Sequence, residues 1–340
     1  MKVPQLEDEV PSDLVNQLEE FEGEFLYPLG GASWFSISHG KDYLRFFRAM
    51  GRSVLFIAEQ HGQVVGSLVL VRRTLSEFAK GTYLRIPSYY VCDFKISRRA
   101  RWTRIPAMLL RAAYDLVSSE GGQSAYGIVM GGTERSPSSY TGRLGIPEFQ
   151  CVGEILILRI LTETMPSEAS RSESTAAMAS HTEYETVSTA LQDEDFVRVR
   201  QRFREPSPGC DALRPEIGNA WMRSEMTPGI VTVKGDLGTG ILEDTRRGKK
   251  LYLMGKSEMV SSHLSALSWT EPQWGAMVIR RALEASGSRQ FPAMFCSVPA
   301  TIWSKLEPYL NGLQIQISPA TIYGCGLAND RQWWVNTSEI

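Results

Sequence analysis

The sequence predicts an α/β (α+β) protein with two similar halves, each a mixed twisted sheet flanked by helices. Three observations predict the architecture. Residues 54–149 alternate β-branched runs with helical patterns in the order strand, turn, strand, strand, helix, strand, helix. Residues 251–326 repeat this order weakly, with different residues. A segment poor in large apolar residues separates the two. The alternative to a duplicated domain is an unrelated C-terminal α+β domain.

Length and composition fit a globular protein. The 340 residues suffice for two domains, and 43% of them are hydrophobic. A net charge of −2 argues against a nucleic-acid partner. The five cysteines form no CxxC pair and the four histidines have no ligand spacing, so we expect no disulfide framework and no metal. The start of the chain has no apolar signal-peptide core, and no apolar run is long enough to span a bilayer. We therefore expect a cytoplasmic protein.

The first half contains the stronger pattern. Two β-branched runs flank His61-Gly62, where glycine permits the positive φ of a hairpin turn. Apolar residues at helical spacing follow in 105–118. The expected helices are 14–21, 42–50, 105–118 and 138–144, and the expected strands are 54–60, 63–71, 89–96, 125–130 and 152–161.

A boundary lies at residues 164–183, which are rich in Ser, Ala, Thr and Glu. Such a segment buries too little apolar surface to offset its ordering, so it predicts a flexible linker between domains 1–163 and 184–340. In the second half we expect helices 191–203, 274–286 and 302–310, and strands 251–255, 259–267, 291–298, 313–318 and 322–326.

The hairpin AEQHGQVVGSLVL, the following strand, the turn that begins at Arg101 and the helix with Leu109-Leu110 resemble the GNAT (Gcn5-related N-acetyltransferase) superfamily. The resemblance covers about residues 40–160 and implies an acyl-coenzyme A site. The family turn reads Arg/Gln-x-x-Gly-x-Gly/Ala. In this sequence Arg104 and Pro106 replace its two small residues.

The resemblance assigns the binding residues for the cofactor. The backbone of Phe94, Lys95 and Ile96 is expected to pair with pantetheine. The turn and the helix start are expected to bind the pyrophosphate, partly through guanidinium groups in place of backbone amides. These residues are Arg99, Arg101, Trp102, Thr103, Arg104, Ile105 and Pro106. The alternative is a solvated charge run at the end of a strand.

Three residues are candidates for proton transfer. The family helix that ends in LYxKxGF often supplies a tyrosine as general acid for the departing thiolate, and Tyr140 is one residue from that position. Asp93 and Glu134 are candidate bases that would deprotonate the acceptor amine. The alternatives are packing for Tyr140 and ion pairs with local arginines for the two carboxylates.

The second half lacks the phosphate turn, since TEPQWGAMVIRRAL offers Gly275 alone and no basic residue before it. The tandem arrangement is similar to protein N-myristoyltransferases, which implies that the first half binds the donor and the second shapes the acceptor site. Aromatic side chains would line a groove there, or simply form the core. They are Trp269, Trp274, Trp303 and Tyr309.

The sequence therefore predicts an N-acyltransferase that moves an acyl group, acetyl or a longer fatty chain, from acyl-coenzyme A to a primary amine of a peptide or small molecule. Two alternatives stay open. One is a non-catalytic binding module, which the missing glycines favour. The other is an enzyme that takes its acyl group from an acyl carrier protein docked on the arginines.

Overall fold

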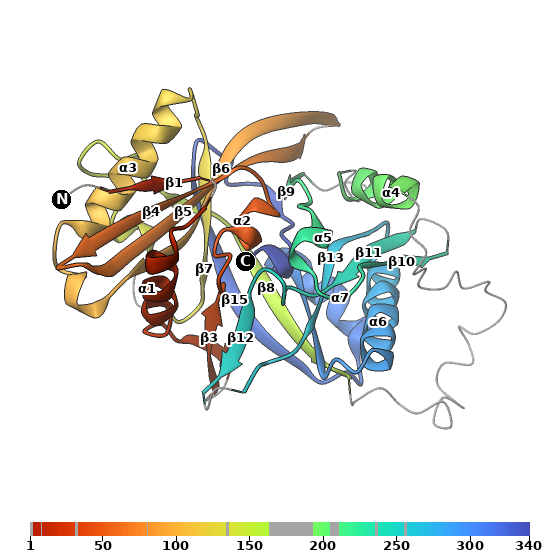
Figure 1. Ribbon diagram of the computed structural model, residues 1–340. Helices are drawn as coiled ribbons and strands as arrows, with labels where there is room; N and C mark the ends of the chain where they lie inside the picture. The colour runs from red at the N-terminus through yellow and green to blue at the C-terminus, as the bar shows by residue number, and fades with distance from the viewer. Residues whose placement is uncertain are drawn as a thin grey trace.

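The fold is built on one large mixed sheet. The computed structural model describes residues 3–7, 9–30, 33–79, 81–133, 136–162, 193–204, 211–234, 237–254 and 257–340. Thirteen strands of these described residues form the main sheet. Eleven follow the order β1-β4-β5-β6-β7-β15-β8-β14-β13-β11-β10; β9 pairs with β5, and β16 pairs with β9. A second sheet has the order β12-β3-β2. Figure 1 shows α3 at one end of the molecule and α6 at the other, with the C-terminal end between them.

The first half supplies helices α1 to α3 and strands β1 to β8. The apolar face of α1 buries Leu14, Leu18 and Phe21, and α3 packs on β4 and β5. The bounds are β1 Gln5–Leu6, α1 Ser12–Glu22, β2 Tyr27–Gly30, β3 Ser33–Ser38, α2 Arg45–Arg48, β4 Ser53–Gln60, β5 Gln63–Ala79, β6 Thr82–Ile96, α3 Ile105–Ser119, β7 Ala125–Met130 and β8 Gln150–Leu161.

The second half supplies the remaining elements. Helix α6 is long and packs its buried face on β11, β13 and β10. The bounds are α4 Asp193–Arg204, β9 Ala212–Pro215, α5 Ala220–Arg223, β10 Gly229–Val233, β11 Gly238–Glu243, β12 Lys250–Leu253, β13 Ser262–Trp269, α6 Pro272–Ser288, β14 Ala293–Pro299, α7 Trp303–Leu306, β15 Ile315–Cys325 and β16 Gln332–Trp333.

The two halves repeat one design. In the first, β4-β5-β6 are antiparallel and β6 pairs parallel with β7 through the crossover helix α3. In the second, β10-β11-β13 are antiparallel and β13 pairs parallel with β14 through α6. Strands β15 and β8 lie between the two units. The repeat expected from the order of elements is therefore present in the topology.

The halves also exchange strands. Strand β15 comes from the end of the chain but pairs with both β7 and β8 of the first half. The long β5–β6 hairpin extends beyond the first unit, and β9 pairs with its outer part. The main sheet is thus continuous across both halves. The division at 1–163 and 184–340 stays a prediction, and residues 164–183 lie outside the described residues.

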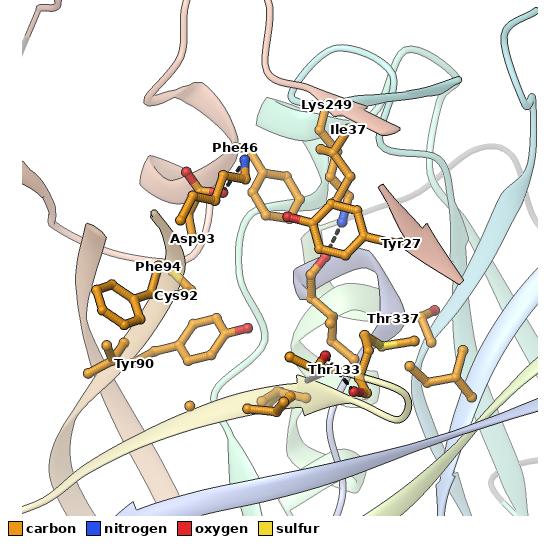
Figure 2. A pocket seen from close by; sticks show the side chains of 18 of the residues that line it. Tyr27, Ile37, Phe46, Tyr90, Cys92, Asp93, Phe94, Thr133, Lys249 and Thr337 are labelled. Carbon is orange, nitrogen blue, oxygen red and sulfur yellow. Dashed lines mark hydrogen bonds and ion pairs between the residues drawn. The ribbon is translucent and has the colours of Figure 1, made fainter. Parts of the chain in front are cut away.

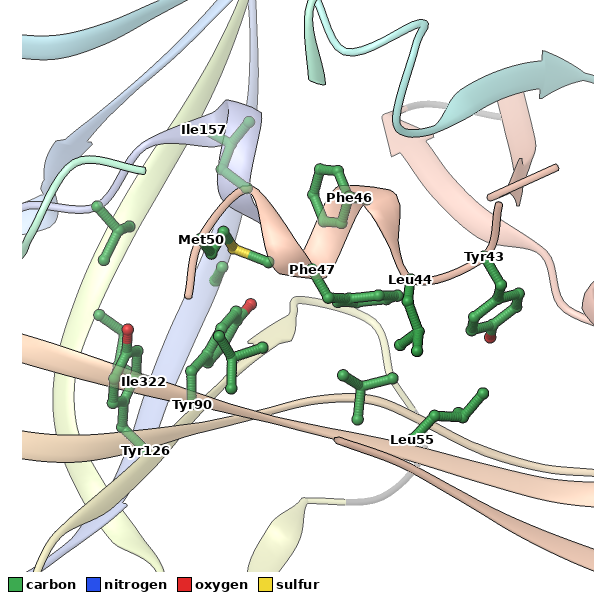
Figure 3. Packing of buried hydrophobic residues seen from close by; sticks show 14 of the residues in the cluster. Tyr43, Leu44, Phe46, Phe47, Met50, Leu55, Tyr90, Tyr126, Ile157 and Ile322 are labelled. Carbon is green, nitrogen blue, oxygen red and sulfur yellow. The ribbon is translucent and has the colours of Figure 1, made fainter. Parts of the chain in front are cut away.

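A cluster of buried apolar side chains lies where the halves meet. Figure 3 shows Phe46 and Phe47 of α2 above the strands, with Tyr90 and Tyr126 beneath them. The rings of Tyr90 and Tyr126 stack with centroids 4.9 Å apart. This core fixes β6, β7 and α2 relative to one another.

Several expected elements differ in the structure. The predicted helix 138–144 is a short 3-10 turn, Pro137–Ser139, because Gly142, Leu144 and Gly145 take positive φ values that end helical geometry. The predicted helix 42–50 is α-helical only over Arg45–Arg48. The predicted strands 313–318 and 322–326 are one strand, β15. In the part of the chain that the structure describes, no helix is long and apolar enough to cross a membrane.

Candidate active site

Strands β6 and β7 separate after a short parallel contact. They pair only at Tyr89 with Ala125 and at Tyr90 with Tyr126. Beyond that point β6 carries a bulge, and Asp93 there has a φ of 50°. A non-glycine residue rarely adopts this left-handed conformation, which costs about 1 kcal/mol or more. The bulge turns β6 away from β7 and opens a gap between them.

A cavity of about 330 Å³ begins at this gap and continues toward the second half. Figure 2 shows Tyr90, Cys92 and Phe94 on one side of it, Tyr27, Ile37, Lys249 and Thr337 on the other, and Thr133 at the bottom of the view. Its wall is largely apolar. The lining residues from the first half include Tyr27, Phe35, Ile37, Phe46, Tyr90, Phe94, Leu110, Ile128, Met130, Tyr140, Phe149 and Ile157, and those from the second include Lys249, Leu251, His263, Phe295, Thr337 and Ile340.

Next to the gap lies the arginine turn. Arg98–Ala100 forms a 3-10 turn directly after β6, and α3 begins at Ile105, as the sequence predicts. Arg99 and Arg104 are exposed, and Trp102 is 85% exposed. The guanidinium of Arg99 donates to Gln63 Oε1 over 2.7 Å. Arg101 is half-buried.

The first turn of α3 offers few backbone donors. The Ile105 amide donates to Thr103 Oγ1 over 3.2 Å, Pro106 has no N–H, and the Met108 amide donates to the Arg104 carbonyl over 3.0 Å. A phosphate at this helix start would therefore depend more on guanidinium groups than on amides.

Beneath α3, Gly66 of β5 permits a close approach. A Cβ at this position would lie 2.9 Å from Leu109 Cδ1, 3.1 Å from Ile96 Cδ1 and 3.2 Å from Ile105 Cγ2. Ile96 and Ile105 are both buried in this contact. Their side chains therefore belong to the core.

Charged side chains behind the bulge form a buried network. Lys95 Nζ lies 2.6 Å from Asp93 Oδ1 and 2.8 Å from Glu22 Oε1. Tyr43 donates to the other Asp93 oxygen, Oδ2. Glu22 also accepts from the His39 amide over 3.0 Å and contacts His39 Nδ1 at 2.6 Å.

Burial alone would raise the pKa of Glu22, but His39 and Lys95 outweigh it and lower the pKa to about 2. Burial would lower the pKa of Lys95, but Asp93 and Glu22 outweigh it and raise that pKa. Glu22, His39 and Asp93 have their ligand atoms within 4.8 Å of one another, the spacing of a metal site. The Lys95 ammonium contacts both carboxylates, so it supplies the positive charge there.

The three proton-transfer candidates have different positions. Tyr140 lines the cavity with its ring edge-to-face on Phe94, centroids 5.7 Å apart. Asp93 also lines the cavity, but each of its carboxylate oxygens already accepts a hydrogen bond or ion pair. Glu134 lies outside the described residues.

Lys249 and His263 are cavity residues that the sequence did not single out. Lys249 directly precedes β12, is buried, and donates to the main-chain oxygen of Ile340, with its ammonium 4.4 Å from the centroid of Phe46. His263 starts β13, and its Nδ1 lies 3.0 Å from Thr337 Oγ1. Among the described residues, its buried Nε2 has no hydrogen-bond partner. The tertiary fold brings both to the cavity.

The second half has an equivalent gap, which the chain itself fills. Strands β13 and β14 pair in parallel only at Ser262 with Met294 and at His263 with Phe295. Beyond this, residues 335–339 bond to both strands. The Ala266 amide donates to Asn336 Oδ1 over 2.8 Å, Ser265 and Ser338 bond through their hydroxyls, and Ser297 donates to the Val335 carbonyl. The gap in the first half opens into the cavity, whereas in the described part of the chain residues 335–339 occupy the gap in the second half.

No protein-family model matches the chain, and no curated protein matches it in sequence. Solved structures do match. A crystal structure of Saccharomyces cerevisiae N-myristoyltransferase with bound myristoyl-CoA superposes with a TM-score of 0.60 at 9% identity, over 95% of this chain and 82% of that one. A structure of the same yeast enzyme with myristoyl-CoA and inhibitors gives a TM-score of 0.61 at 10% identity, over 99% and 83%.

The fold is that of N-myristoyltransferases. The match spans nearly the whole chain, so it covers both halves and the strand exchange between them. This confirms the predicted fold class, a tandem GNAT-like arrangement with a mixed sheet flanked by helices. At this level of sequence identity the likeness establishes the fold alone and assigns no role to a residue.

Proposed function

We propose that the protein is an N-acyltransferase that transfers an acyl group from acyl-coenzyme A to a primary amine. One observation carries the proposal. The gap between β6 and β7 opens into the cavity at one end and adjoins the arginine turn at the other. A thioester carrier laid along β6 would place its phosphates at Arg99, Arg101 and Arg104 and its acyl group in the cavity.

The second gap supports the assignment of donor and acceptor sides. Because residues 335–339 already bond to β13 and β14, a second carrier has no room there. The second half instead contributes Lys249, His263 and Thr337 to the far end of the cavity. We assign the donor to the first half and the acceptor amine to the side facing the second half.

The cavity favours a fatty acyl chain over acetyl. Its wall is formed mainly by aromatic and aliphatic side chains, among them Tyr90, Ile128, Met130, Ile157 and Phe295. Water binds poorly to an apolar wall of this kind. Burial of a hydrocarbon chain in the cavity is therefore favourable in free energy. The neighbours of known structure hold myristoyl-CoA, which supports a medium or long chain by analogy.

The bulge in β6 positions backbone groups that would polarise the carbonyl of the thioester. The backbone around Asp93 leaves regular pairing with β5, and Ser67 Oγ holds the Asp93 carbonyl over 3.0 Å. A fixed N–H beside the acyl carbonyl would stabilise the oxyanion as the amine attacks. The C–N bond forms, the C–S bond breaks, and coenzyme A leaves as a thiol.

Isothermal titration with acetyl-, decanoyl- and palmitoyl-coenzyme A tests the donor, followed by thiol release with a mixture of amines. We expect tighter binding of the longer chains and thiol release that depends on an amine. Arg104→Gln should weaken binding of coenzyme A, while Arg281→Gln on α6 is a matched control. No binding of any thioester would refute the proposal.

Two other outcomes have distinct readouts. Binding without thiol release would identify a non-catalytic coenzyme A module. Inert acyl-coenzyme A together with salt-sensitive turnover of acylated carrier protein would identify the carrier as the donor, because the exposed Arg99 and Arg104 also fit an acidic surface.

A further inference from the structure

Two residues of β6 have no ladder partner at the point where the strand leaves β7. The pairing with β5 skips Asp93 and Phe94, which together oppose the single residue Leu68. A residue in the left-handed conformation of Asp93 directs its own N–H and C=O to opposite sides, as a helical residue does. The directions of the amides at this bulge therefore depend on the contacts that hold Asp93.

Ser67 holds the carbonyl of the bulge. Its buried hydroxyl on β5 donates to the Asp93 carbonyl oxygen over 3.0 Å. A trans peptide points its C=O and the following N–H in opposite directions. Because β5 and β7 flank β6 on opposite sides, the Phe94 amide points away from β5, toward the gap in which the thioester carbonyl would lie.

The Asp93 side chain is held by two further groups. Tyr43, two residues before α2, donates to Oδ2, and the Lys95 ammonium lies 2.6 Å from Oδ1. Lys95 also pairs with Glu22, the last residue of α1, over 2.8 Å. The side chains of Tyr43, Lys95 and Glu22 are buried, so water competes little for these contacts. The carboxylate thus anchors the bulge to α1 and to the segment before α2.

The bulge of the second half has no carboxylate. Ala266 matches Asp93 in φ and in its position after a paired residue, and Thr239 matches Ser67 in its pairing. There the Ala266 amide already donates to Asn336, which fills the gap. The chain itself therefore holds the amide of the filled gap, whereas buried side chains behind the bulge hold those of the open gap.

Resting on the proposed function, we infer that four positioning residues hold the bulge amides in place against the thioester carbonyl. We call them the bulge clamp: Ser67, Tyr43, Asp93 and Lys95. As the amine attacks, the thioester oxygen gains negative charge, and N–H groups that are already oriented stabilise this charge without reorganising. The clamp acts on the backbone of β6, so it assigns Asp93 to positioning.

The main test measures the C=O stretch of bound decanoyl-coenzyme A labelled with ¹³C at its carbonyl, by isotope-edited infrared spectroscopy without an amine. Strong hydrogen bonds to the carbonyl oxygen lower this frequency, so we expect a lower value in the wild-type complex than in water. Ser67→Ala should return the frequency toward the value in water. Tyr43→Phe, which removes the hydroxyl that donates to the carboxylate, should do so in part.

Turnover should follow the spectrum. We expect Ser67→Ala to lower kcat about tenfold to a hundredfold and to change the Kd for decanoyl-coenzyme A less than about twofold. Ser67→Thr keeps the hydroxyl and should restore both kcat and the lowered frequency, since a threonine occupies the matching position of the second half. Thr239→Ala is the matched control and should change neither, because the chain already fills that gap.

A C=O stretch that is not lowered, in a wild type that binds the donor and releases thiol with an amine, would overturn the inference and leave the proposed function intact. Equal frequencies in the wild type and in Ser67→Ala at full occupancy would also overturn it, since a loss of kcat would then reflect a general structural role. If Ser67→Ala does not fold, Tyr43→Phe provides the same comparison. No binding of any thioester to the wild type would instead refute the proposed function, and the inference with it.

Discussion

Asp93 on β6 and Ala266 on β13 occupy matching positions in the two halves and share the same uncommon backbone, with φ values of 50° and 52°. Each lies on the strand that separates from its parallel partner, after two paired residues. At Ala266 the amide donates to the side-chain oxygen of Asn336. This contact shows, within the same molecule, that the bulge amide is oriented to bind a carbonyl oxygen in the gap.

The positive φ of Ala266 predicts that a change to glycine there and the same change at Ala276 have opposite effects on the free energy of unfolding. Ala266→Gly removes a Cβ that disfavours positive φ, so we expect the free energy of unfolding to stay level or rise by up to about 1 kcal/mol. Ala276→Gly is the matched control, because this buried alanine lies in α6. There the same change should cost about 1 kcal/mol. Urea unfolding of both variants measures the difference, and a loss at Ala266 equal to that at Ala276 would contradict the strain argument.

A second prediction concerns the contact between α3 and the sheet. Gly66→Ala places a Cβ within 3.2 Å of Leu109, Ile96 and Ile105, so we expect a loss of about 1–3 kcal/mol in unfolding free energy. Because α3 must move to relieve the overlap, binding of acyl-coenzyme A should also weaken. Gly287→Ala in α6 is the control, since its nearest neighbour is Thr162 Cβ at 3.6 Å. Thermal unfolding measures the loss of stability, and calorimetric titration measures the affinity for acyl-coenzyme A. Unchanged affinity with lowered stability would mean that the position of α3 does not affect binding.

Local sequence patterns predicted α3 and β7 of the first half. The start of α3 at Ile105 and the bounds of β7 agree with the sequence, because apolar periodicity and flanking turns determine them locally. The sequence predicted strand β15 as two strands, 313–318 and 322–326, and Pro319 lies between them. In the structure, pairing of β15 with β7 begins only at Ala320, so the missing N–H of Pro319 costs no bond on that side.

Much of the site depends on distant parts of the chain. Lys249, His263 and Thr337 reach the cavity only because β15 and residues 335–339 return to the middle of the sheet. No local pattern marks these residues as cavity residues, since each lies among other polar residues of a strand or turn. Asp93 was a candidate base from its position on the central strand, but only the structure shows that Lys95 and Tyr43 occupy both of its oxygens.

The third prediction concerns acid stability. Glu339 is buried and lies 3.0 Å from both Arg73 and Arg223, and it accepts from the Gly218 amide over 2.7 Å. Burial alone would raise its pKa, but the two arginines outweigh it and lower the pKa from 4.5 to about 2. A carboxyl group whose pKa is lower in the folded state stabilises the fold fully when the pH is above its unfolded-state pKa. This contribution is lost as the pH falls toward its folded-state pKa.

We therefore expect stability to drop between pH 4.5 and 2, with Glu22 contributing in the same window because its pKa is also lowered to about 2. Glu339→Gln should lose about 3–5 kcal/mol at neutral pH, since it leaves buried arginine charge uncompensated, and it should show a shallower acid dependence. Glu307→Gln, at an exposed surface position, is the control with an effect near zero. Denaturant melts from pH 7 to 2.5 test this; an unchanged slope in Glu339→Gln would contradict it.

The last prediction concerns Tyr140 as the general acid that protonates the leaving thiolate. Its ring lies edge-to-face on Phe94, next to the gap through which the thioester would pass. If its hydroxyl protonates the departing thiolate, Tyr140→Phe keeps the ring contact and removes the proton donor, the hydroxyl group. We expect kcat to fall about tenfold to a hundredfold, with the Kd for acyl-coenzyme A unchanged. Tyr114→Phe on α3 is the control. Donors with a more acidic leaving thiol should recover most of the lost rate, because they need less protonation. An equal loss for all donors would mean that Tyr140 only packs against Phe94.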